Sequence, residues 1–254
     1  MFGLCALSDD VVLIATGDQL RTLTLRNKEL SHRDPCALEG VCRVAFDKHT
    51  DTLLCVCLRG GANWLVSLRS GANAIDWLEV KRLRITDSWI RIGQLDVCES
   101  RALLAQAIET CRLRVFEVNA QHGLRSVCTV ETEIPFWRFT CSRIGPDTLV
   151  AFAHQTAVSL HRLAARRLEP LDRFELGDPY NLLFRGDLLL VTNRNNETDP
   201  DAIVPLLATE GHLMLLPLLL DAMDSVCIDE WCLVGDHLVV VEDRSKDMLE
   251  YAFE

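Results

Sequence analysis

The chain has 254 residues, of which 49% are apolar and 25% are charged, and this balance excludes a disordered protein. The formal net charge of −11 disfavours partners that select basic proteins, so we expect no nucleic acid and no membrane partner. Residues 1–127 carry 16 basic against 15 acidic side chains, whereas residues 128–254 carry 10 against 22, so the acidity belongs to the second half.

A short motif recurs along the chain: a polar position, any residue, then two branched aliphatic residues. Five of its six copies begin with Asp, whose side chain can accept backbone N–H groups and close a turn before a strand. Successive copies end 42, 50, 46, 40 and 49 residues apart, and a period near 45 is typical of radial repeats. The six copies end at Val12, Leu54, Leu104, Val150, Leu190 and Val239.

Each copy has similar neighbours in the chain. An alternating segment precedes most copies, a second follows the motif's own apolar run, and a fourth, more polar segment usually comes next. Alternation with period two and frequent turn residues predicts strands rather than helices. The segments before the motif are 41–47, 90–98, 136–142, 180–185 and 226–233; those after it are 19–25, 64–68, 112–118, 157–163, 203–208 and 248–253; the fourth segments are 77–85, 124–131, 168–176 and 212–220.

Four strands in about 45 residues predict a blade, and radially stacked blades bury both faces of each sheet. We therefore expect an all-β fold with about six four-stranded blades in one domain over residues 1–254. The expected blades cover roughly 1–40, 41–87, 88–134, 135–178, 179–222 and 223–254. The last segment ends after its third strand, so the sequence leaves open whether the ring closes without a clasp, is a truncated copy, or is completed by another polypeptide.

These repeats resemble the β-propeller superfamily in its WD-repeat and quinoprotein-like branch. The run from Val44 to Leu54 is similar to the inner strand, turn and second strand of such a blade. No Gly-His pair opens a repeat and no Trp-Asp pair closes one, so the resemblance indicates no specific family. It implies a ring that is usually clasped by strand exchange between its ends.

The eleven cysteines favour a reducing compartment. They include no CxxC pair, and many lie inside apolar runs such as Leu54–Leu58, where a free thiol behaves as a small hydrophobe. The first ten residues lack the basic start and the long apolar centre of a signal peptide. We therefore expect a cytoplasmic, or else nuclear, protein.

Motifs for familiar enzyme chemistry are absent: the sequence contains no HExxH, GxSxG, GxxxxGK[ST] or GxGxxG. His154 and His161 flank Ser159 in one expected hairpin, but a catalytic pair would also need an orienting carboxylate and an oxyanion site. We expect no catalytic residue, metal or cofactor.

The favoured function is a non-catalytic interaction module or scaffold that binds a protein or peptide through its rim and its acidic half. The alternative is a hydrolase or lactonase-like enzyme with a metal or carboxylate site at the channel mouth, and a degenerate copy without activity is a third possibility. Aromatic and cationic residues near the inner strands are the candidate partner contacts, although they could equally pack between blades or pair with carboxylates. These candidates are Trp89, Arg91, Trp137, Arg138 and Arg185.

Overall fold

A computed structural model gives the fold. It describes residues 2–16, 19–27, 29–33, 38, 40–70, 77–86, 92–105, 107, 110–193, 202–209, 211–216, 228–242 and 248–252. Strands and turns account for these residues, and none of them belongs to a helix long and apolar enough to span a bilayer. The protein is therefore all-β over its described part, as the alternating patterns predict.

The strands pair into six small antiparallel sheets, and within each sheet the strands follow one another in chain order. The first sheet contains β1 (Phe2–Ala6), β2 (Val11–Thr16), β3 (Gln19–Thr24) and β4 (Glu29–Arg33), and the second contains β5 (Val41–Asp47), β6 (Thr52–Arg59), β7 (Ala62–Ser70) and β8 (Trp77–Thr86). The third contains β9 (Gln94–Cys98), β10 (Arg101–Ala105), β11 (Thr110–Asn119) and β12 (Gly123–Phe136), and the fourth contains β13 (Arg138–Ile144), β14 (Asp147–Ala153), β15 (Ala157–Ala164) and β16 (Arg167–Glu175). The fifth contains β17 (Pro179–Arg185), β18 (Leu188–Asn193), β19 (Ala202–Thr209) and β20 (His212–Leu215), and the sixth contains β21 (Ile228–Val234), β22 (His237–Glu242) and β23 (Met248–Ala252).

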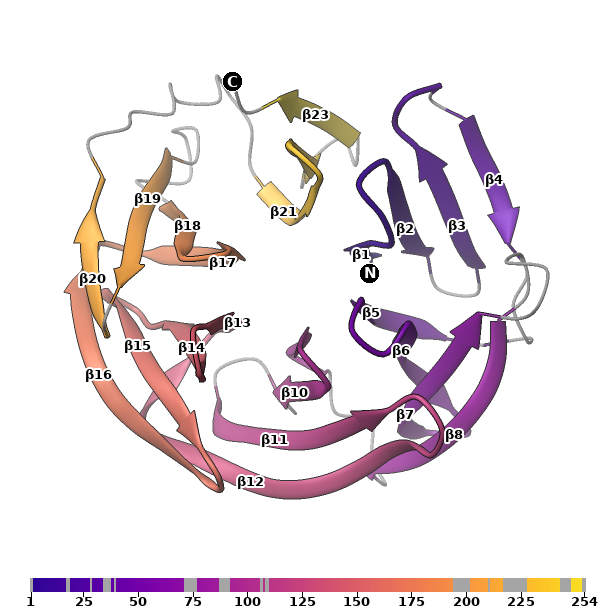
Figure 1. The fold of residues 1–254 in the computed structure, drawn as a ribbon, viewed down its shortest axis with the longest axis horizontal. Coiled ribbons are helices and arrows are strands. Elements are labelled where there is room, and N and C mark those ends of the chain that lie inside the picture. Colours follow the sequence, from indigo (N-terminus) through magenta and orange to yellow (C-terminus); the bar gives the residue numbers. More distant parts are fainter. Residues whose placement is uncertain are drawn as a thin grey trace.

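The sheets stand side by side in a ring around a central opening (Figure 1). The first strand of each sheet lies nearest the centre, and the last strand of each four-stranded sheet lies at the outer edge. Because all consecutive pairs are antiparallel, the turns between first and second strands gather on one side of the ring.

Apolar side chains hold neighbouring sheets together. The buried residues form six clusters, and each cluster joins two adjacent sheets. The third and fourth sheets, for example, share a cluster in which Phe136, Phe139 and Phe152 contact one another. Each sheet therefore buries both faces, which a lone four-stranded sheet could not do.

The ring closes where the sixth sheet packs on the first. Val12 and Ile14 of β2 are buried against Val234 and Val239 of the sixth sheet. Among the described residues the sixth sheet has three strands, and β1 belongs to the first sheet instead of crossing over. The expectation of about six four-stranded sheets is corrected on this point: five have four strands, and sheet-to-sheet packing makes the closure.

Candidate functional site

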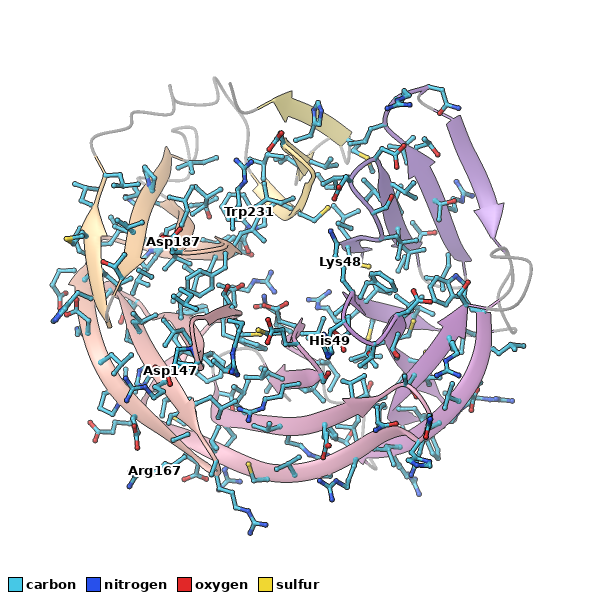
Figure 2. The ribbon with its side chains drawn as sticks, in the orientation of Figure 1. Lys48, His49, Asp147, Arg167, Asp187 and Trp231 are labelled. Carbon is cyan, nitrogen blue, oxygen red and sulfur yellow. The ribbon has the colours of Figure 1, made fainter. Side chains whose placement is uncertain are left out.

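The central opening contains a cavity of about 400 Å³. Its walls come from the first strands of the sheets, with Cys5, Val44, Asp96, Thr140, Phe184 and Trp231 among the lining residues. Figure 2 shows Lys48, His49 and Trp231 around this opening, while Arg167 lies at the outer edge. The cavity is therefore a channel lined by residues of all six sheets.

Two charged residues in the channel wall, the buried Arg43 and the partly buried Asp96, join neighbouring sheets. Arg43 of β5 is 6% exposed, and its Nε and Nη2 atoms each donate to the carbonyl oxygen of Gly93 at 3.1 Å. Asp96 of β9 accepts from Thr140 Oγ1 and the Cys141 amide, both at 2.9 Å, across to β13. These charges are held by hydrogen bonds between sheets, so they stiffen the channel wall.

Burial raises the pKa of Asp96 above its ordinary value, although its hydrogen bonds from Cys141, Val97 and Thr140 act in the opposite direction. A buried carboxyl in a cavity is a common catalytic feature. Here, however, both oxygen atoms already accept hydrogen bonds from protein donors, because the Val97 amide binds Oδ1 at 2.8 Å. Its geometry is that of a structural carboxylate.

The six turns between first and second strands form a continuous band on one side of the ring, which we call the turn ring. Each turn contacts the next: Lys48 pairs with Asp9 at 3.5 Å, and Arg143 pairs with Glu99 at 3.6 Å. The other junctions are the Ser100 amide on Asp47, Ser142 on the Gly186 carbonyl, Arg185 on Asp236, and the backbone of Gly235 beside that of Asp9.

The turn ring is rich in carboxylates because the repeated motif places Asp there. Six acidic residues and one basic residue, Lys48, lie on these turns, and Arg143 and Arg185 pair with two of the acidic residues from the strands before the turns. The acidic set is Asp9, Asp10, Asp51, Glu99, Asp187 and Asp236. Asp51 and Asp187 are both exposed on their turns. The turn ring therefore presents a negative surface around the opening.

The predicted partner contacts lie in different places. Arg138 lines the channel, where its guanidinium stands 5.5 Å from the ring centre of Tyr180 and donates to the Gly93 carbonyl at 3.4 Å. Arg185 is paired with Asp236 in the turn ring, and Trp137 is 38% exposed at the start of the fourth sheet. Trp89 and Arg91 lie outside the described residues.

A second cavity, of about 530 Å³, lies between the third and fourth sheets away from the channel, and we call it the side groove. One wall is the 131–134 stretch of β12, and the other comes from β15, β16 and the turn before β15. Its apolar lining includes Ile134, Leu168, Pro170 and Leu171.

The side groove brings His154, Ser159 and His161 into one hydrogen-bonded chain. His154 Nε2 lies 2.7 Å from Ser159 Oγ, and Ser159 Oγ lies 3.0 Å from His161 Nε2. At the other end of the chain, His154 Nδ1 lies 2.8 Å from the carbonyl oxygen of Pro135 in β12.

The hydrogen-bond partners determine which atoms of His154, Ser159 and His161 carry hydrogens. A carbonyl oxygen only accepts, so His154 Nδ1 carries a hydrogen, and in the neutral ring Nε2 then accepts from the Ser159 hydroxyl. Because that hydroxyl has one hydrogen, His161 Nε2 must donate to Ser159 Oγ. His161 Nδ1 is left as an acceptor, and this buried atom has no hydrogen-bond partner within the described part of the chain.

Burial keeps both imidazoles neutral. It lowers the pKa of His154, while the Pro135 carbonyl raises it and Arg173 lowers it. Burial also lowers the pKa of His161 to about 4, with a smaller contribution from His154. At neutral pH the Ser159 hydroxyl therefore faces an unprotonated imidazole nitrogen.

The sequence shows two histidines flanking Ser159 but not the group that orients them. That group is the Pro135 carbonyl, 19 residues before His154 and on a different sheet. No side-chain pattern identifies a backbone carbonyl as a partner, so this contact needed the structure. No group of three or more potential metal-ligating side chains occurs among the residues that the structure describes.

No family model matches the sequence, and no curated protein matches it. Solved structures do resemble the fold. A periplasmic gluconolactonase of Pseudomonas aeruginosa matches with a TM-score of 0.65 and 12% identity, over 100% of this chain and 81% of that one. A putative 6-phosphogluconolactonase of Bacteroides fragilis gives 0.64 and 11%, over 99% and 80% of the two chains. Saccharomyces cerevisiae Sqt1 gives 0.58 and 11%, over 100% and 74%.

The chain has a β-propeller fold. Matches at 11–12% identity support the fold but not a function, because one fold supports many unrelated functions. The function must therefore be argued from the sites of this propeller.

Proposed function

We propose that this propeller is an interaction module that binds a basic segment of a protein or peptide on the turn ring. The observation that carries the proposal is the set of six carboxylates on five of the six turns around the channel mouth. A rigid surface with one sign of charge attracts and orients a partner of the opposite sign. The charge of the second half, where the sequence is most acidic, adds to this field.

The rigidity of the platform supports the same proposal. Arg43 and Asp96 are committed to bonds between sheets, and adjacent turns contact one another all around the ring. A surface held in this way loses little conformational entropy when it binds a partner. Arg138 beside Tyr180 and the buried Trp231 line the opening and offer contacts to a side chain that enters it.

The alternative, a lactonase-like enzyme acting at the channel mouth, has less support. Two of the solved structures with this fold are named as a gluconolactonase and a putative 6-phosphogluconolactonase. In the channel of this propeller, however, Asp96 is occupied by three protein donors. The geometry around the channel therefore favours binding over catalysis.

Fluorescence anisotropy can test the proposal with two labelled twelve-residue peptides, one containing six Lys and Arg and the other six Asp and Glu. We expect saturable binding of the basic peptide, weakening with salt, and none of the acidic one. The double variant Asp51→Asn, Asp187→Asn should weaken binding about tenfold, since each lost charge contributes up to about 1 kcal/mol. The matched control is Glu131→Gln, Glu175→Gln, at the ends of the third and fourth sheets opposite the turn ring. Equal binding of both peptides, or equal loss in both double variants, would overturn the proposal.

A further inference from the structure

The side groove interrupts an otherwise apolar interface. On the corresponding faces, the third strands of other sheets contribute Val66 and Leu68, Phe116 and Val118, or Leu206 and Ala208 to the clusters between sheets. On β15 the same face carries Ser159, His161 and Leu163, of which only Leu163 joins the cluster. Polar groups placed beside such a core cost stability unless they are paired, and His161 Nδ1 has no hydrogen-bond partner among the described residues.

Ser159 and His154 have the geometry of a nucleophile and its base. The Oγ to Nε2 distance of 2.7 Å allows direct proton transfer, and the Pro135 carbonyl holds the imidazole in the tautomer that accepts the hydroxyl proton. A serine nucleophile needs such an oriented base, and an uncharged hydrogen-bond acceptor can do the orienting. The orienting contact comes from β12, so this arrangement depends on the groove.

Two side chains with N–H groups lie beside Ser159 on the same face of the sheet. His161 Nε2 donates to Ser159 Oγ at 3.0 Å. Arg173 is the cross-strand partner of Ser159 in the register of β15 and β16 and lines the groove, and its Nε donates to Glu175 Oε1 at 2.7 Å. A developing negative oxygen next to Ser159 would therefore have the His161 N–H as its donor, while the Arg173 guanidinium, held by Glu175, contributes only its positive charge.

The apolar and acidic residues that line the side groove indicate which class of substrate it would bind. Ile134, Leu168 and Leu171 form an apolar wall that suits an acyl chain. Glu131, Glu133 and Asp172 also line the groove and disfavour an anionic substrate. A neutral carboxylic ester fits both conditions.

From these contacts we infer that the side groove is a serine esterase site, distinct from the turn ring, with Ser159 as nucleophile and His154 as general base. Ser159 Oγ attacks the ester carbonyl carbon while its proton passes to His154 Nε2. The tetrahedral adduct collapses, the bond to the alkoxy oxygen breaks, and the alcohol leaves with the proton from His154. Water then attacks the acyl-serine with the same base, which releases the carboxylic acid and restores the Ser159 hydroxyl.

The test is active-site phosphonylation of the purified chain at pH 8 with an uncharged alkyl fluorophosphonate, followed by intact and peptide mass spectrometry. We expect one adduct per chain, on Ser159, and none on heat-denatured protein. Hydrolysis of p-nitrophenyl butyrate should rise from pH 5 to pH 7.5, because His154 must be neutral to accept the proton.

Variants separate a catalytic role from a structural one. Ser159→Ala should lose the adduct, and His154→Gln should reduce labelling at least tenfold. Ser67→Ala is the matched control, since Ser67 is a buried serine on the third strand of the second sheet whose hydroxyl donates to the Lys81 carbonyl. It should be labelled like the wild type.

Because the wild-type chain is itself probed, the result does not depend on how the variants fold. No adduct after overnight exposure, an adduct on another residue, or equal labelling of denatured protein would overturn the inference. None of these results concerns the peptide-binding proposal, which is measured on a different face.

Discussion

Asp96 illustrates how a single residue of this propeller joins two sheets. Its carboxylate accepts from the amides of Val97 and Cys141 and from the Thr140 hydroxyl. Removing it would leave buried donors unpaired, and each unpaired group costs about 1–3 kcal/mol.

We therefore expect Asp96→Ala to lower the free energy of unfolding by about 3 kcal/mol, and Asp96→Asn, which keeps one acceptor, by about 1 kcal/mol. Urea denaturation measures both values. As a control, Asp187→Ala on the exposed turn should change stability by less than about 0.5 kcal/mol. Similar values for Ala at positions 96 and 187 would show that the carboxylate does not tie the sheets together.

His161 predicts a pH dependence of stability. Its pKa in the folded protein, about 4, is below the unfolded value of 6.5, so between these values the unfolded chain binds a proton that the folded chain does not. Stability should therefore fall as the pH drops from about 6.5 to about 4, by about 2 kcal/mol after allowance for solvent screening. His154, whose pKa is also lowered, acts in the same direction.

Replacement of His161 by Leu should remove most of this dependence and leave the protein at least as stable at pH 7, because the unpaired nitrogen disappears. Melting temperatures of both proteins at pH 7 and pH 5 check the expectation. A variant with an unchanged pH profile would contradict the assignment to His161.

Sequence reasoning at the residue scale was least informative about contacts made by the backbone. Arg138 and Arg185 were recognisable as candidates, but their partners, the Gly93 carbonyl and Asp236, come from other sheets. The hydrogen-bonded arrangement in the side groove could not be predicted for the same reason, since no sequence pattern marks the Pro135 carbonyl as a partner of His154. Whether Trp137, Arg138 or Arg185 contacts a partner remains a prediction.

At the scale of elements, glycine positions distinguish a free turn from a close approach between sheets. Gly123, with φ of +71°, begins β12, and an added Cβ would stand 2.7 Å from Lys81 Cβ and from Ser67 Oγ in the second sheet. Gly145, with φ of +59°, begins a turn where an added Cβ would meet nothing within 4 Å.

Gly145→Ala should therefore cost about 1 kcal/mol, the cost of the left-handed backbone alone. Gly123→Ala adds crowding against another sheet and should cost about 3 kcal/mol in total. Denaturant unfolding of the two variants provides the comparison, and equal losses would mean that the second and third sheets do not meet closely at this turn.

The aspartate-led motif predicted the strand order well, because turn chemistry and alternation are local. It could not predict which neighbour each strand faces. Val12, Leu104 and Val150 pack toward the preceding sheet, whereas Leu54 and Leu190 pack toward the following one. Val12, Leu104 and Val150 are the second or fourth residue of their strands, whereas Leu54 and Leu190 are the third. Because successive residues of a strand point to opposite faces, this offset between the motif and the start of the strand reverses the face, and the motif does not encode the offset.

At the scale of the whole molecule, the junction between the sixth and first sheets differs from the others. The sixth sheet has three strands in the described part of the chain, and the contact with the first sheet rests on side-chain packing and the close approach of Gly235 to Asp9. The last repeat of the sequence has no fourth segment, which raises the question of how the ring closes. The sequence could not show that side-chain packing closes it.

We expect amides of β22 and β23 to exchange with deuterium faster than those of β14 and β15, because the described part of the sixth sheet has fewer strands to unpair. Hydrogen exchange followed by mass spectrometry would reveal the difference. Uniform protection around the ring would show that the closing junction is as strong as the rest.

The buried thiols offer a way to follow separation of the sheets without introducing any label. Cys5, Cys55, Cys141 and Cys232 are buried near the centre, on four different sheets, and burial raises the pKa values of Cys5, Cys55 and Cys141. A protonated, covered thiol reacts with an alkylating reagent only when its neighbourhood opens. The order in which these positions become alkylated in mild denaturant would therefore report where the propeller first comes apart.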